Sequence, residues 1–365
     1  MKPRNPILAV VPVILALMSG SHALQQSGGD SKNDREADRL HRAGLSHYHA
    51  GEYEKAIEAY EQAIQLSPRS VETYYNLGMA YGSLGRYRDA VEVYNRALRI
   101  EPEYAPAHYN LGHAYSNLKQ FEKAIRAFQH AIQYDPDNLE AYLALGKAYS
   151  DSGKREKAID TLEQAIRRKP DDPYVYYNLG LLYFPSGPHA ATVDAFTQAI
   201  SRDPRYPEPY YYRACAYLLL GRGESAAGDA QTYLSLKGWQ AEHSLDLALV
   251  AYFGHLQARQ KAAAIRVLQE AVRKGDKKIW PFRLIEFLLD ESSEQLLLEL
   301  APDRESVVEA RAFIGLNLSL KGDQRAALVH LKWVEDNSRS ESFPSALAAS
   351  EIERIKSSSA VFPEK

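Results

Sequence analysis

Cysteine is almost absent from this chain, because its 365 residues include only Cys215. A single cysteine excludes an intramolecular disulfide framework and any zinc site built from several cysteines, and we expect it to be buried in a helix pair. An excess of charge is also lacking, since 44 basic side chains face 47 acidic ones. A net charge of −3 excludes the broad positive field of a protein that binds nucleic acid or anionic lipid. We therefore expect no nucleic-acid partner.

The N-terminal apolar stretch is too short to cross a membrane. It covers Ile7 to Met18, whereas a bilayer core requires roughly 20 residues. Two basic residues precede it, and small residues that end at Ala23 follow it. This order is typical of a secretory signal peptide over residues 1–23, with cleavage after Ala23. We expect a mature chain without a membrane span that is exported to the periplasm or secreted; an uncleaved N-terminal anchor is the alternative.

Motifs of catalysis and cofactor binding are lacking too. The sequence has no glycine-rich phosphate loop, no His-Glu-x-x-His and no Gly-x-Ser-x-Gly. His41, His47 and His49 lie close together in the sequence, but on one helix they would point to different faces. We predict no metal site, no cofactor and no enzymatic activity. The enzymatic alternative is a site within the irregular segment 275–305.

A repeat of 34 residues runs through most of the chain. Prolines recur at that step at positions 68, 102, 136, 170 and 204. Leu-Gly pairs keep the same step, and their glycines are Gly78, Gly112, Gly146 and Gly180. Each unit has apolar positions at helical spacing on two segments separated by a turn, which predicts two helices. One such pair cannot bury its apolar surface alone and must stack on its neighbours.

Small and bulky residues recur within each unit. A glycine inside a helix costs about 1 kcal/mol relative to alanine, so its repetition in each first helix predicts a close approach of the two helices. The expected facing surface on the second helices consists of Ala56, Ala90, Ala124 and Ala158, with the bulky residues Tyr60, Tyr94, Phe128 and Leu162 beside them.

The pattern Tyr-x-x-Leu-Gly-x-x-Tyr, then Ala-x-x-x-Tyr/Phe-x-x-Ala, then Pro resembles the tetratricopeptide repeat (TPR). The resemblance implies an all-α fold, a right-handed α-solenoid of stacked helix-turn-helix repeats. Five units are expected after a flexible linker over 24–36, at 37–70, 71–104, 105–138, 139–172 and 173–206. In the fifth unit Pro185-Ser186-Gly187-Pro188 replaces the usual turn and Thr192 replaces the usual alanine. We therefore expect a wider bend there.

The pattern decays after the fifth unit without stopping. Degenerate TPR-like helix pairs are expected over 207–274, and irregular short helices over 275–305. A last TPR-like unit and a capping helix are expected over 306–356, because a solenoid end otherwise exposes its core. A tail over 357–365 follows. This layout also resembles, more loosely, that of bacterial envelope TPR adaptor proteins, although a cysteine for lipid attachment is missing.

The resemblance also implies where a ligand binds. In the TPR family the first helices of successive units line a concave groove for peptides, and positions two before and two after the Leu-Gly leucine commonly face it. The corresponding candidates are Tyr75, Met79, Tyr109, His113, Lys147, Tyr177 and Tyr211. The implied function is an exported scaffold that binds a protein or peptide partner in this groove. The alternative is a structural or assembly subunit of a cell-envelope complex that binds through its C-terminal half.

Overall fold

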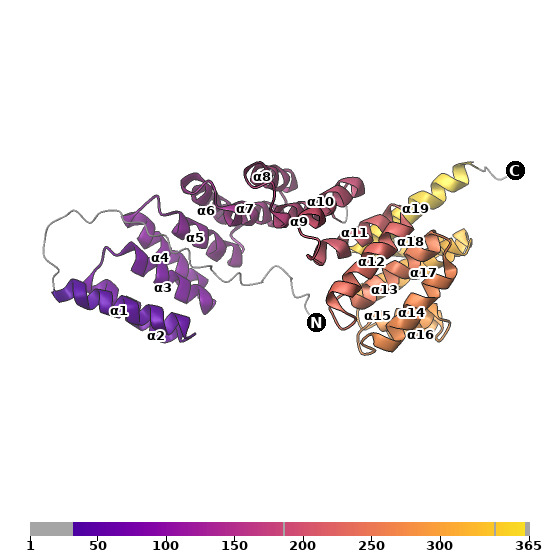
Figure 1. Ribbon diagram of the computed structural model, residues 1–365, viewed down its shortest axis with the longest axis horizontal. Helices are drawn as coiled ribbons and strands as arrows, with labels where there is room; N and C mark the ends of the chain where they lie inside the picture. Colours follow the sequence, from indigo (N-terminus) through magenta and orange to yellow (C-terminus); the bar gives the residue numbers. More distant parts are fainter. Residues whose placement is uncertain (1–31, 185–186, 339–340, 362–365) are drawn as a thin grey trace.

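The computed structural model describes residues 32–184, 187–338 and 341–361. Within these ranges the chain forms nineteen α-helices and no strand, which confirms the all-α prediction. The helices follow one another along an elongated molecule, from the indigo N-terminal helices to the orange and yellow C-terminal ones (Figure 1). The predicted signal peptide with its cleavage site after Ala23 lies outside the described residues, as do residues 185 and 186 of the unusual turn.

The five predicted units are present as helix pairs. They are α1 (Lys32–His49) with α2 (Tyr53–Leu66), α3 (Val71–Ser83) with α4 (Tyr87–Ile100), α5 (Ala105–Asn117) with α6 (Phe121–Tyr134), α7 (Leu139–Asp151) with α8 (Arg155–Arg168), and α9 (Pro173–Tyr183) with α10 (His189–Arg202). The two helices of a pair pack against each other, and each second helix packs against the first helix of the next unit. This sequential packing is that of a TPR solenoid.

The repeated glycine marks the close crossing of the two helices in a unit. A Cβ atom on Gly112 would lie 2.5 Å from Cε1 of Phe128. Equivalent contacts bring Gly44 to Tyr60, Gly78 to Tyr94 and Gly180 to Phe196. In the fourth unit the smaller Leu162 leaves 3.1 Å beside Gly146. The predicted close approach is confirmed, with the bulky side chain rather than the alanine as the direct partner of the glycine.

The turn inside each of units 1 to 4 contains one residue with positive φ. Glycine provides it in several units, for example Gly85 at φ +71°, whereas the third unit uses Lys119 at φ +57°. In the fifth unit residues 184–188 connect the two helices, compared with 84–86 in the second unit, so this connection is longer. Thr192, which replaces the alanine, is fully buried. Its hydroxyl is satisfied there, because Oγ1 donates a hydrogen bond to the carbonyl of Pro188 at 3.3 Å.

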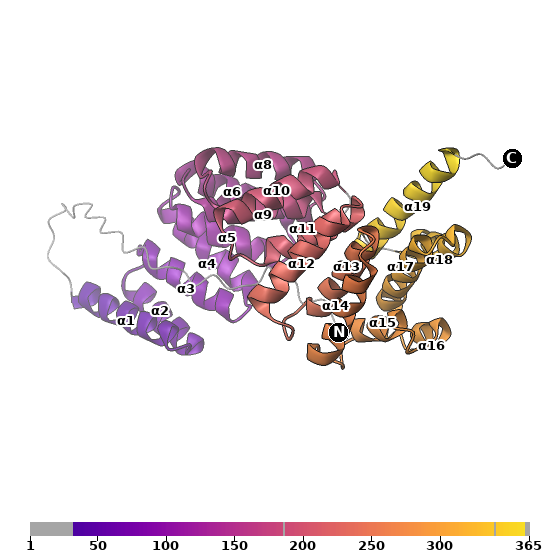
Figure 2. The same ribbon diagram turned by 45° about the vertical axis from the view of Figure 1, so that its right-hand side comes forward.

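The remaining helices continue the array and then turn back on it. They are α11 (Glu208–Leu219), α12 (Gly223–Lys237), α13 (Ser244–Gln257), α14 (Lys261–Lys274), α15 (Pro281–Leu288), α16 (Glu294–Glu299), α17 (Arg304–Leu320), α18 (Gln324–Asn337) and α19 (Phe343–Val361). Each of these helices packs against the next one in sequence, and α15 and α17 also pack against α13. Figure 2 shows α13 to α19 gathered at one end of the molecule.

The last helix closes this C-terminal part. As predicted, α19 packs against α17 and α18; it also packs against α11. Nη2 of Arg354 donates a hydrogen bond to the carbonyl of Leu219 at 3.2 Å. One continuous hydrophobic core extends from Tyr210 to Ile355. We call α11–α19 the C-terminal body, because it is closed on itself rather than an open continuation of the superhelix.

Two predicted boundaries are wrong. Helix α1 begins at Lys32, so residues 32–36 are helical and not linker; an ion pair between Glu36 and Arg39, one turn apart, accompanies this extension. Helix α19 continues to Val361 instead of ending at residue 356. No glycine or proline interrupts residues 30–43 or 345–361, and both segments can therefore remain helical.

Candidate functional site

The first helices form the inner face of the stack. The first helix of each unit contacts the first helix of the next unit, as α1, α3, α5 and α7 show. Among the described residues, consecutive second helices make fewer contacts with each other than consecutive first helices do. Because the first helices stand closer together than the second helices, the stack curves with the first helices inside. This is the concave face implied by the resemblance.

Six of the seven predicted groove residues lie half-buried on first helices of units 2 to 5. They are Tyr75 and Met79 on α3, Tyr109 and His113 on α5, Lys147 on α7, and Tyr177 on α9. Half-burial leaves part of each side chain available to a ligand while neighbouring residues hold the rest in place.

Tyr75 links two units. Its hydroxyl accepts a hydrogen bond from Nδ2 of Asn110 at 3.0 Å. Its ring meets the ring of Tyr104 edge to face, with centroids 5.5 Å apart. Burial raises the pKa of Tyr75 above its ordinary value, so the phenol is neutral at pH 7. The side chain therefore offers a fixed, uncharged aromatic surface.

Tyr109 and His113 form a second aromatic contact one unit further along. Their ring centroids are 4.5 Å apart, and His113 also lies 5.1 Å from the ring of Phe128. Burial lowers the pKa of His113 to about 4, so its imidazole is neutral at pH 7. The charge of Lys147 in the next unit is balanced, because its Nζ pairs with Oδ1 of Asp151 at 2.9 Å.

Tyr177 lies in an aromatic cluster at the end of the fifth unit. Its ring centroid is 5.1 Å from that of Tyr206 and 6.0 Å from that of Tyr212. Tyr174, which is 55% exposed, packs against Tyr206 at 5.0 Å. Burial raises the pKa of Tyr177 far above its ordinary value. This cluster therefore combines neutral, fixed rings with one open aromatic side chain.

Sequence reasoning missed Tyr104 and Tyr206. Both occupy the repeat position at which Ser70, Asn138 and Asp172 cap first helices with their side chains. Tyr104 is the N-cap residue of α5 but makes no capping hydrogen bond. A tyrosine at a position where other units have a capping residue was the sequence signal that could have identified both side chains.

Tyr211, the seventh predicted groove residue, lies in the C-terminal body and not with the other six. Its ring packs on His243 with centroids 4.5 Å apart and lies against the core of that body. Helices α13 and α19 both contact α11, which carries Tyr211. Cys215 on the same helix is 1% exposed, which confirms its predicted burial; this burial raises the pKa of its thiol. The row of available groove side chains therefore ends in unit 5.

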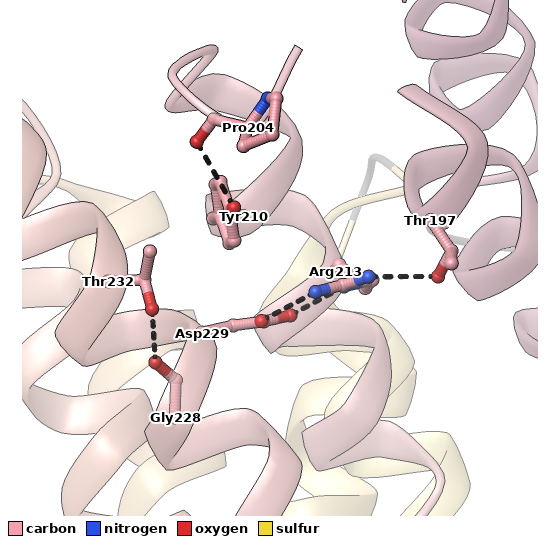
Figure 3. Close-up of polar contacts among 7 residues, drawn as sticks. All are labelled: Thr197, Pro204, Tyr210, Arg213, Gly228, Asp229 and Thr232. Carbon is pink, nitrogen blue, oxygen red and sulfur yellow. Dashed lines mark hydrogen bonds and ion pairs between the residues drawn. The ribbon is translucent and has the colours of Figure 1, made fainter. Parts of the chain in front are cut away.

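A largely buried ion pair fixes α11 where the row ends (Figure 3). Nε and Nη2 of Arg213 donate to the two carboxylate oxygens of Asp229 on α12 at 2.7 and 2.8 Å, and Nη1 donates to Oγ1 of Thr197 on α10 at 2.9 Å. Burial raises the pKa of Asp229, although Arg213 opposes this effect. The three-helix connection stabilises the junction between unit 5 and the C-terminal body.

The described parts of the chain contain no group of three His, Cys, Asp or Glu side chains that could hold a metal ion. Nδ1 of His41 lies 2.9 Å from Oγ1 of Thr73, and Nδ1 of His47 lies 2.6 Å from a carboxylate oxygen of Glu52.

Within the residues that the structure describes, no helix combines the length and apolarity that crossing a membrane requires.

The irregular segment 275–305 contains α15 and α16 and contacts one deeply placed carboxyl group. Nε1 of Trp280 donates to Oε2 of Glu309 on α17 at 2.9 Å. Burial and the nearby carboxylate of Asp246 raise the pKa of Glu309 above its ordinary value, and the hydrogen bond from Trp280 opposes this shift. The indole N–H of Trp280 thus provides a hydrogen-bond donor for the carboxyl group of Glu309.

Comparisons with known proteins agree with the repeat pattern. Family profiles described as "TPR repeat" match residues 44–85 and 80–119, and profiles described as "Tetratricopeptide repeat" match residues 118–180 and 173–206. No curated protein sequence matches the chain significantly.

Similar solved structures include bacterial TPR proteins. MamA is 30% identical over 45% of this chain and 96% of its own, with a TM-score of 0.43. PilF of Pseudomonas aeruginosa is 18% identical over 56% of this chain and 94% of its own, with a TM-score of 0.47. A TPR protein from Parabacteroides merdae is 20% identical over 70% of this chain and 98% of its own, with a TM-score of 0.50. From its repeats, its helix pairs and these profile matches, the chain belongs to the tetratricopeptide repeat family.

Proposed function

We propose that this protein is a scaffold that binds a segment of a partner protein on the inner face of α3, α5, α7 and α9, without catalytic turnover. TPR proteins are generally protein-interaction scaffolds, and family membership supports this class of function. The observation that carries the proposal is the row of half-buried, neutral tyrosines at one repeat position, namely Tyr75, Tyr109 and Tyr177.

The chemistry of this row suits a polypeptide ligand. A tyrosine ring offers a large apolar surface with a polar tip, and it loses little conformational freedom on binding. The contacts of Tyr75 with Asn110 and of Tyr177 with Tyr206 hold the rings in place before binding, which lowers the entropic cost of association. The single cation of the row, Lys147, is paired with Asp151, so apolar and aromatic contacts dominate.

We also propose that the scaffold acts outside the cytoplasm. The order of basic, apolar and small residues over 1–23 supports export. Purification of the protein from its natural host and sequencing of its N-terminus tests this proposal. An N-terminus just after Ala23 in the periplasm or medium supports it, and an intact Met1 in the cytoplasm contradicts it.

Binding on the inner face can be tested with peptides selected from a random peptide library against the full chain. We expect Tyr177→Glu and Tyr109→Glu each to weaken the selected peptides about tenfold or more, because each introduces a charge into an apolar contact. Tyr87→Glu is the matched control, since Tyr87 is also half-buried but lies on the second helix α4. Equal loss in the control, or full affinity in both inner-face variants that remain helical, would contradict the proposal.

A second candidate surface has one supporting observation. Among the described residues, all exposed large apolar side chains except Tyr174 lie in the C-terminal body. Leu296 and Leu300 at α16 are 44% and 49% exposed, and Val329 on α18 is 64% exposed. Such side chains favour docking of an assembly partner.

Point variants are the appropriate test of this second surface. Deletion of residues 241–365 would remove most of a core that begins at Tyr210, so loss of binding would then report unfolding. Leu296→Asp with Leu300→Asp leaves the core side chains in place. If this double variant still forms every complex of the parent protein, the C-terminal body is not the docking surface.

A further inference from the structure

Recesses open on the outer face where consecutive second helices diverge. One lies between α4 and α6 with α5 as its floor and has a volume of about 690 Å³. Another lies between α12 and α14 with α13 as its floor and has a volume of about 1250 Å³. The two recesses share an architecture and differ in charge, so the second serves as an internal comparison for the first.

The first recess, which we call the basic recess, has three exposed cations, Arg99, Lys123 and Arg126. None of them forms an ion pair with another described residue. The carboxylate of Glu92 lines the same recess but pairs with Arg96 at 2.7 Å. Glu122, one turn before Arg126, pairs with Lys154 of the next unit at 2.6 Å. The positive charge of the recess is therefore not balanced within the protein.

The recess between α12 and α14 shows a different charge balance. Its Arg273 and Lys274 both pair with the carboxylate of Glu270, at 3.5 and 3.2 Å. One carboxylate thus serves both cations, Glu291 adds a second carboxylate to the lining, and Arg266 is the third cation of this recess. Divergence of the second helices alone does not produce the unbalanced charge of the basic recess.

The other repeats show which residues the fold requires at the positions of the recess. The position of Arg126 is acidic in every other unit of the five, where it is Glu58, Glu92, Asp160 or Asp194. The position of His108 is tyrosine in units 2, 4 and 5, namely Tyr74, Tyr142 and Tyr176. Packing of a unit therefore needs neither Arg126 nor His108, and Arg126 replaces an acidic side chain with a cation that favours binding of an anion.

Aromatic rings form one wall of the basic recess. His108 lies 5.1 Å from His130 and 5.4 Å from Tyr134, measured between ring centroids. Nε2 of His108 donates to the carbonyl of Pro102 at 2.8 Å and so fixes the ring. His108 is thus held in place, whereas the three cations are exposed and can turn towards a ligand.

We propose that the basic recess binds an acidic segment of a partner protein, with its aspartate or glutamate carboxylates on Arg99, Lys123 and Arg126. Charge complementarity supports this occupant, because three unpaired cations converge from α4 and α6 on one open recess. The planar guanidinium groups of Arg99 and Arg126 match carboxylates in a bidentate manner. This site is on the opposite face of α5 from Tyr109, so it is separate from the groove of the proposed function.

The test uses the full chain and a fluorescent peptide of alternating glutamate and serine, with a glutamine–serine peptide of equal length for comparison. We expect the glutamate peptide to bind, with an affinity that falls as salt increases, and the glutamine peptide not to bind. Arg126→Glu and Arg99→Gln each introduce a residue that other units carry at that position. We expect about tenfold weaker binding in each variant.

Arg167→Gln is the matched control, because Arg167 occupies the position of Arg99 in the fourth unit, outside the recess. We expect Arg167→Gln and Tyr177→Glu to leave binding unchanged. No binding of the glutamate peptide at low salt, or equal loss in Arg167→Gln, overturns the proposal. Tighter binding of a phosphoserine peptide without carboxylates, with loss in Arg126→Glu, contradicts the choice of an acidic segment.

Discussion

At the scale of single residues, the contact between a glycine and a bulky side chain fixes the geometry of each unit. The sequence pattern predicted this contact, because a glycine repeated inside a helix must offset its cost of about 1 kcal/mol elsewhere. The pattern did not predict Tyr104, Tyr206 or His108. These residues differ from the repeat consensus. The consensus identifies the residue type that the units share, but it does not predict the contacts of a residue that differs from it.

Two glycines of the array should respond oppositely to the same substitution. We expect Gly112→Ala to lower the free energy of unfolding by about 1–2 kcal/mol, since its Cβ would lie 2.5 Å from the ring of Phe128 and overpack the crossing. Gly146→Ala should be neutral or stabilising, because Leu162 leaves 3.1 Å and can move. Urea unfolding followed by circular dichroism measures both. Equal effects at the two positions would show that the ring contact does not determine stability.

His113 should make stability depend on pH. Burial lowers its pKa to about 4 in the folded protein, whereas the ordinary value in an unfolded chain is about 6.5. Between these values the unfolded state binds the additional proton, so the free energy of unfolding falls as pH decreases. The total loss attributable to this group is up to about 3 kcal/mol.

The variant His113→Gln isolates this contribution from that of other titrating groups. We expect its free energy of unfolding to decrease less than that of the parent protein between pH 7 and pH 4, because glutamine does not titrate. Urea unfolding at both values provides the comparison. Identical pH dependence in the two proteins would mean that folding does not shift the pKa of His113.

At the scale of helices, periodicity predicted the pairs but not their distant contacts. The 34-residue step locates α1 to α10 because each helix packs on its neighbours in sequence. Contact of α19 with α11, as in the hydrogen bond from Arg354 to Leu219, joins segments that have no common repeat position. No local pattern encodes such a contact, and the closure of the C-terminal body was therefore not predictable from the sequence.

The connection among α10, α11 and α12 depends on a largely buried ion pair. We expect Asp229→Ala to destabilise the protein by about 3 kcal/mol or more, because it leaves the guanidinium of Arg213 without its carboxylate. The double variant Arg213→Met with Asp229→Leu should recover most of this loss, since no buried charge remains. Thermal unfolding of the three variants measures the effect. A double variant as unstable as Asp229→Ala would contradict this assignment.

At the scale of the whole molecule, an open stack of five units is joined to a closed body. The stack has several small hydrophobic clusters, whereas the C-terminal body has one continuous core. A stack whose units contact only their neighbours unfolds progressively, and a single core favours cooperative unfolding. This difference separates the stack that carries the proposed groove from the C-terminal body.

Ile352 in α19 allows this division to be measured. It is 2% exposed in the core of the C-terminal body, and we expect Ile352→Ala to cost about 2–5 kcal/mol. Because the core is continuous, amide hydrogen exchange should become faster in α11 and α17 as well as in α19. Exchange in α3 and α5 should not change. Faster exchange confined to α19 would show that the body does not act as one cooperative unit.

The central claim is that a partner polypeptide lies along the inner face of the first helices. Photo-crosslinking tests it most directly, with a benzophenone side chain placed at Met79 on α3 or, as the comparison, at Arg88 on the outer helix α4. With a library-selected peptide, we predict a crosslink from position 79 and none from position 88. A crosslink from position 88 without one from position 79 would contradict the claim.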